Sequence, residues 1–148
     1  MDNKLNPISI LLVEDNPNDV EITRRALEKG RVINELIVAR DGQEAMDILS
    51  AAKNGEARCP GLILLDLNLP KVDGHEVLAK IKADPKLKRI PVVALTVTTR
   101  QEDVVRSYDL GVNTFISKPV EFQEFIKVVT TIKEYWLLIA TLPPVEQS

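Results

Sequence analysis

Polar side chains that could do chemistry together stand where stretches of apolar residues end. Glu14 and Asp15 follow one such stretch, and Asp66, Thr96 and Lys118 each end or follow another. If the stretches are parallel strands, their carboxyl ends lie along one edge of a sheet, and these groups converge there. Each residue alone is an ordinary turn or surface residue, but their joint placement at the correct strand ends is not expected by chance.

The three acidic residues predict a cation site. Carboxylates held close together repel one another unless a cation lies among them. An all-oxygen site that the protein fills only in part suits Mg²⁺, which keeps several waters. We expect Asp15 and Asp66 to be carboxylate ligands, the main-chain carbonyl of Asn68 to be a third ligand, and Glu14 to act through a water.

The remaining groups predict phosphoryl transfer. A cation, the ammonium of Lys118 and the hydroxyl of Thr96 would together stabilise the charge on a transferring phosphoryl group. A carboxylate can accept that group as an acyl phosphate, so Asp66 is the expected phosphoacceptor.

The elements that must position these residues alternate regularly along the chain. Short apolar strands are predicted at residues 8–13, 35–40, 62–66, 91–96 and 114–117. Helices are predicted from Asn16-Pro17 to Gly30, after Asp41-Gly42, from about residue 74 to Asp84-Pro85, over residues 100–110 and from residue 121 onward. This alternation predicts an α/β fold, a doubly wound five-stranded parallel sheet with five helices and a long C-terminal helix.

Length, charge and cysteine content limit the classes of protein. The chain has 148 residues, a length that favours one domain, and we expect it over residues 1–142 with a disordered tail at 143–148. The net charge of −3 gives no support for nucleic-acid binding. Cys59 is the single cysteine, and no apolar run is long enough to span a membrane, so a cytoplasmic location is expected. Cys59 is assigned no role. We expect His75 to be exposed on a helix, and it is assigned no role either.

The motifs around these positions resemble those of response regulator receiver domains, which have a flavodoxin-like fold. The resemblance covers roughly residues 8–138 and rests on Leu11–Asp15, on Leu64–Pro70 with Asp73-Gly74, on Leu95-Thr96 and on Lys118-Pro119. It implies Mg²⁺-dependent phosphorylation of Asp66 by a sensor histidine kinase, with Thr96 and Phe115 as switch residues. It also implies no enzyme activity beyond self-catalysed phosphotransfer onto Asp66 and slow autodephosphorylation.

The C-terminal helix is apolar over much of its circumference, which is typical of a buried helix or an interface. We therefore expect a homodimer through the fourth helix, the fifth strand, the fifth helix and the C-terminal region. The ending Glu134–Pro143 and the segments Asn16–Asp19 and Tyr108–Asn113 resemble small receivers paired with bacterial phytochrome kinases. A phytochrome-type histidine kinase is therefore the expected partner, with no membrane partner.

Three other classes of protein fit the sequence less well. A haloacid-dehalogenase-like hydrolase needs a second Asp two residues after its nucleophile, and position 68 is Asn. A nucleotide or flavin binder needs a phosphate-binding loop, but the loop after the first strand is acidic and has no glycine. A receiver-like scaffold or dimerisation protein that is never phosphorylated should have an incomplete site, and this sequence has every expected part.

Overall fold

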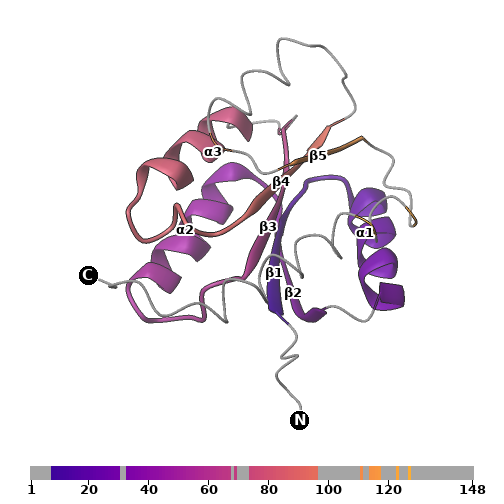
Figure 1. Cartoon of the computed structure of the whole chain (residues 1–148), viewed down its shortest axis with the longest axis horizontal. Helices are drawn as coiled ribbons and strands as arrows, with labels where there is room; N and C mark the ends of the chain where they lie inside the picture. Colours follow the sequence, from indigo (N-terminus) through magenta and orange to yellow (C-terminus); the bar gives the residue numbers. More distant parts are fainter. Residues whose placement is uncertain are drawn as a thin grey trace.

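Five parallel strands form a single sheet in the computed structural model, with the spatial order β2-β1-β3-β4-β5. The structure describes residues 8–30, 33–67, 69, 74–96, 111, 114–117, 123 and 127. The strands are β1 (Ile8–Val13), β2 (Ile33–Ala39), β3 (Leu62–Asp66), β4 (Val92–Thr96) and β5 (Thr114–Ser117). The described helices are α1 (Pro17–Gly30), α2 (Gly42–Lys53) and α3 (Gly74–Ala83). Helices α2 and α3 cover one face of the sheet and α1 lies on the other (Figure 1).

The central strands are buried because their residues are apolar on both faces. All five residues of β3 are buried, as are the β1 residues from Ser9 to Val13. One core cluster joins alternate residues of the strands to the inner sides of α2 and α3, through Leu49, Leu78 and Ile81. This double burial is the property of parallel sheets that carry helices on both faces.

Side-chain caps fix where α1 and α2 begin. The side-chain oxygen of Asn16 accepts hydrogen bonds from the N–H groups of Asn18 at 2.8 Å and Asp19 at 3.3 Å, which confirms the predicted cap. Asp41 accepts the N–H of Glu44 at 2.8 Å, and the Glu44 carboxylate accepts the N–H of Arg40 at 2.7 Å. The bonds to Asn16 hold the chain where it leaves β1, and the bonds made by Asp41 and Glu44 hold it where it leaves β2.

The predicted parallel sheet is present, and β2 is the strand whose limits differ most from the prediction. It begins at Ile33 rather than residue 35, because the ladder with β1 pairs Ile8 with Ile33. An edge strand tolerates polar residues such as Glu35, which is exposed. The pattern of apolar residues therefore predicts the start of such a strand only weakly. The predicted helix at 100–110 and the tail at 143–148 lie outside the described residues; Gln123 and Lys127 of the last predicted helix are helical and exposed.

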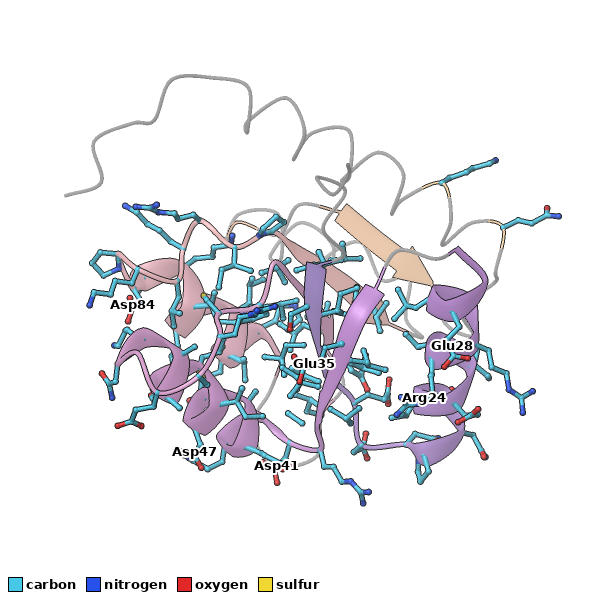
Figure 2. The ribbon with its side chains drawn as sticks, turned by 90° about the horizontal axis from the view of Figure 1, so that it is seen from below. Arg24, Glu28, Glu35, Asp41, Asp47 and Asp84 are labelled. Carbon is cyan, nitrogen blue, oxygen red and sulfur yellow. The ribbon has the colours of Figure 1, made fainter. Side chains whose placement is uncertain are left out.

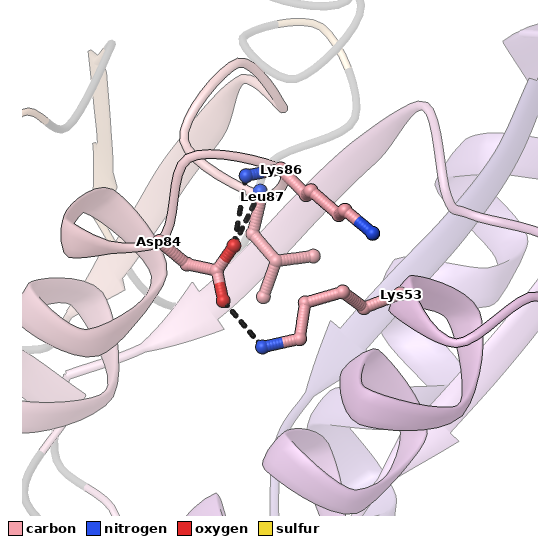
Figure 3. Close-up of polar contacts among 4 residues, drawn as sticks. All are labelled: Lys53, Asp84, Lys86 and Leu87. Atoms are coloured by element: carbon pink, nitrogen blue, oxygen red, sulfur yellow. Dashed lines mark hydrogen bonds and ion pairs between the residues drawn. The ribbon is translucent and has the colours of Figure 1, made fainter. Parts of the chain in front are cut away.

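The loop after α3 is fastened to its neighbours by two lysines. Lys53, at the end of α2, donates to the Asp84 carboxylate at 2.7 Å, and the N–H groups of Lys86 and Leu87 donate to the other oxygen (Figure 3). Lys82 donates to the carbonyls of Lys88 and Ile90, both at 3.0 Å, and burial lowers the pKa of its ammonium. Together these bonds fix the approach of the chain to β4.

No helix in the described part of the chain is both long and apolar enough to cross a membrane.

Replacing Lys53 by Met should reduce the free energy of unfolding at pH 7 by no more than about 1 kcal/mol, as expected for an ion pair near the surface. The hydrogen bond from Lys53 and the bonds from the Lys86 and Leu87 amides hold the pKa of Asp84 below its ordinary value of 3.8. The stabilisation is therefore fully present above that value and is lost as the pH falls through the lower, folded-state pKa.

Urea denaturation from pH 7 to pH 3 measures this difference. The difference in the free energy of unfolding between the natural chain and Lys53→Met should decrease as the pH falls. Lys80→Met, at an exposed position of α3, serves as the control. A difference that stays constant over the range would exclude the ion pair as its cause.

Candidate functional site

The register of the sheet brings the carboxyl ends of β1, β3, β4 and β5 to one edge. Val13 pairs with Leu65, the next residue Asp66 pairs with Leu95, and the following residue Thr96 pairs with Ser117. Residues at or just beyond these positions therefore come from distant parts of the sequence to the same edge, as predicted.

Three carboxylates meet at this edge. Glu14, Asp15 and Asp66 each offer an oxygen atom, and these atoms all lie within 4.8 Å of one another. Glu14 is only 1% exposed and Asp66 only 2%, whereas Asp15 is exposed. We call these residues the acidic trio. Two buried carboxylates and an exposed third carboxylate thus lie close together, and water screens the two buried groups poorly.

Backbone hydrogen bonds fix the part of the trio that follows β1. The N–H of Glu14 donates to the carbonyl of Ala39 in β2 at 2.9 Å, which extends the ladder by one residue. The N–H of Asn16 donates to the Glu14 carboxylate at 3.2 Å. Glu14 is thereby turned into the sheet edge, while Asp15 remains at the surface.

The trio fits a divalent cation of the size of Mg²⁺. Oxygen ligands on opposite sides of Mg²⁺ lie about 4.2 Å apart, twice the usual ligand distance, so a 4.8 Å set needs only small side-chain movements or one bridging water. Glu14, Asp15 and Asp66 would hold the ion. Asn68, the predicted carbonyl ligand, lies outside the described residues, and the water-mediated role of Glu14 stays a prediction.

The remaining predicted site residues are placed by their strands alone. Thr96 is the last residue of β4, and Phe115 lies in β5 opposite Ala94. Lys118 follows Ser117 in the sequence and lies outside the described residues. The roles of Thr96, Phe115 and Lys118 therefore stay predictions, although the two strands that carry or precede them are neighbours.

A close backbone contact at Gly74, which was not predicted from the sequence, supports the end of β3. A Cβ atom on Gly74 would lie 2.5 Å from the carbonyl oxygen of Asp66 and 2.5 Å from the Cα of Leu67. Only glycine therefore lets the start of α3 rest directly on the backbone of the expected phosphoacceptor. The glycine after Asp73 was the available signal, but the contact depends on how α3 approaches β3.

The expectation for His75 was wrong. His75 is 5% exposed rather than exposed, because the first turn of α3 is held against the end of β3 through Gly74. Cys59 is exposed, and partial burial raises the pKa of its thiol, which disfavours the reactive thiolate.

Comparison with known proteins agrees with this geometry. The sequence matches the response regulator receiver domain family over residues 10–130. The chain belongs to this family. Response regulator Rcp1 from Synechocystis sp. is 46% identical over 138 residues, which cover 93% of this receiver and 94% of that protein.

Solved structures of receivers share the fold. The phosphorylated cyanobacterial phytochrome response regulator RcpA has a TM-score of 0.75 and 47% identity, covering 93% of this chain and 99% of that one. The Mn²⁺-bound form of Rcp1 has a TM-score of 0.74 and 45% identity, covering 93% of this chain and all of that one. The resemblance inferred from the motifs is thereby confirmed.

Replacing Gly74 by Ala should destabilise the receiver by about 1–3 kcal/mol, because the new methyl group must push α3 away from β3. The damage should be local. The N–H of Leu67 donates to the carbonyl of Leu95 at 3.0 Å, and its hydrogen exchange should accelerate more than the loss of global stability explains.

Gly55→Ala is the matched control. Gly55 has a φ of 83° and nothing within 4 Å of an added Cβ, so its substitution should cost about 1–2 kcal/mol through backbone strain alone. Equal protection of the Leu67 amide in the two variants, after correction for stability, would contradict the proposed contact.

Proposed function

We propose that this receiver is a single-domain response regulator that accepts a phosphoryl group on Asp66 from a sensor histidine kinase in the presence of Mg²⁺. The observation that carries the proposal is the acidic trio, in which the buried Asp66 lies beside two carboxylates at the carboxyl edge of a parallel sheet. The proposal includes a cytoplasmic location and no enzyme activity beyond self-catalysed phosphotransfer and slow autodephosphorylation.

In the proposed reaction, a carboxylate oxygen of Asp66 attacks the phosphorus of a phosphohistidine. An O–P bond forms, the N–P bond breaks, and the histidine nitrogen leaves with the bonding electron pair and takes up a proton. Bound Mg²⁺ would supply charge neutralisation for the phosphoryl oxygens. Asp15, Asp66 and the main-chain carbonyl of Asn68 would hold the cation, with Glu14 acting through a water, while the ammonium of Lys118 contacts the phosphoryl oxygens.

Phosphorylation would then change the positions of side chains on β4 and β5. In the proposed switch, the Thr96 hydroxyl moves toward the phosphoryl group, and Phe115 rotates into the space vacated. Support comes from the register, which makes the two strands neighbours and pairs Ala94 with Phe115. The added charge would bias two arrangements of a surface that includes β5 and the segments around it.

The partner that we propose is a phytochrome-type histidine kinase. Its support is the family membership together with 47% identity to a receiver described as a phytochrome response regulator. A homodimer through the fourth helix, β5, the fifth helix and the C-terminal region is part of the same proposal.

Incubation with acetyl phosphate should add a single phosphoryl group, and intact mass measurement should show that the addition requires Mg²⁺. Asp66→Asn should abolish the addition, because the amide cannot accept the phosphoryl group. Asp47→Asn serves as the control, because Asp47 is an exposed carboxylate on α2 that lies apart from the trio.

An addition that persists in Asp66→Asn, or that occurs equally after the cation is chelated, would contradict the proposed site. No addition from acetyl phosphate or from an autophosphorylated phytochrome-type kinase would favour a scaffold that is never phosphorylated.

Sedimentation velocity should show dimers of this receiver at micromolar concentration. The same experiment on the phosphorylated and unphosphorylated chain measures whether the equilibrium depends on Asp66. Monomers in both states, up to the highest concentration that stays in solution, would contradict the dimer.

A further inference from the structure

An open pocket of about 240 Å³ lies where β1 ends, α1 begins and β2 ends, and Asp66 does not line it. Glu14 and Asp15 form part of its lining. The rest of the lining is an apolar wall from Pro17, Val20 and Val38, and two basic residues, Arg24 and Arg40. Two carboxylates of the trio and two arginines therefore share one pocket.

Arg24 lies on the side of α1 that faces the sheet (Figure 2). Its side chain is 39% exposed, and Glu21 is the sole described carboxylate within ion-pair distance, at 3.9 Å. That separation is beyond hydrogen-bond length, so the guanidinium keeps donors for another acceptor.

Arg40 directly follows β2 and is exposed. Its backbone N–H is committed to the Glu44 carboxylate, which fixes the position of the residue. Its guanidinium makes no hydrogen bond or ion pair with any residue in the part of the chain that the structure describes. Two arginines thus line the pocket, and the described contacts leave donors of both guanidiniums uncommitted.

We propose that this pocket binds a small oxyanion, a phosphate or a carboxylate, between the guanidiniums of Arg24 and Arg40. Guanidinium groups bind such anions through paired, charge-assisted hydrogen bonds. The volume of about 240 Å³ lies below the range of roughly 300–1,000 Å³ that is usual for drug-sized ligands, and it suits a small anion.

The anion site is coupled to the cation site of the proposed function, on which this part of the inference rests. The carboxylates of the trio oppose an anion at the neighbouring arginines. A divalent cation held by the trio adds two positive charges and reduces that opposition. The anion therefore binds more tightly when the trio holds a cation, and by linkage the anion strengthens cation binding to the same degree.

Nuclear magnetic resonance of the full chain tests the inference, with the Nε–H signals of arginine followed during titration at constant ionic strength. Inorganic phosphate and acetate are the probes, each with and without Mg²⁺ and corrected for Mg²⁺–anion pairing in solution. We expect saturable shifts at Arg24 and Arg40, with at least about threefold tighter binding when Mg²⁺ is present. The comparison of the two probes decides between a phosphate and a carboxylate.

The double variant Arg24→Gln/Arg40→Gln should lose the saturable response, whereas Arg25→Gln should keep it. Arg25 is an exposed neighbour on α1 that is paired with Glu21 at 3.2 Å and does not line the pocket. Shifts that do not saturate, or that are equal in the double variant, would overturn the anion site.

Calorimetric titration with Mg²⁺ alone tests the coupling. Removing both guanidiniums removes their repulsion of the cation, so the double variant should bind Mg²⁺ about 3- to 10-fold more tightly at low ionic strength. Arg25→Gln should stay within about twofold of the natural chain. Unchanged affinity in the double variant would overturn the coupling, and no Mg²⁺ binding in any variant would instead contradict the proposed function.

Discussion

Repulsion between carboxylates is the constraint on which the rest of the structure depends. Glu14 and Asp66 are held almost without solvent at the ends of adjacent strands, and Asp15 lies beside them. Such an arrangement is unfavourable by itself, so the core must stabilise a chain that places them there. The apolar strands, buried on both faces, and the packing of α2 and α3 supply that stabilisation. A rigid interior thus maintains a site that attracts cations.

Much of this arrangement could be predicted from the sequence because the signals are local. Asn16-Pro17 and Gly30 mark the two ends of α1, and the run at residues 62–66 is apolar until Asp66 ends it. Parallel strands then place their carboxyl ends together without further information. The positions of the trio residues therefore follow from where each strand stops.

The features that the sequence did not reveal depend on how elements approach one another. The burial of His75 and the contact at Gly74 require the position of α3 over the end of β3. The pocket of Arg24 and Arg40 joins a helix to the end of an edge strand, and no spacing along the chain predicts it. The early start of β2 at Ile33 is set by its neighbour β1.

The contact at Gly74 also has a mechanical consequence. It leaves no gap between α3 and the backbone of Asp66 and Leu67, so compression of α3 toward the sheet is blocked at that point. Helices α2 and α3 share a single packed cluster with β1, β3 and β4, which makes this part of the molecule stiff. Movement of the Asp66 backbone toward α3 is therefore opposed by direct contact between main chains, and the receiver resists deformation in that direction.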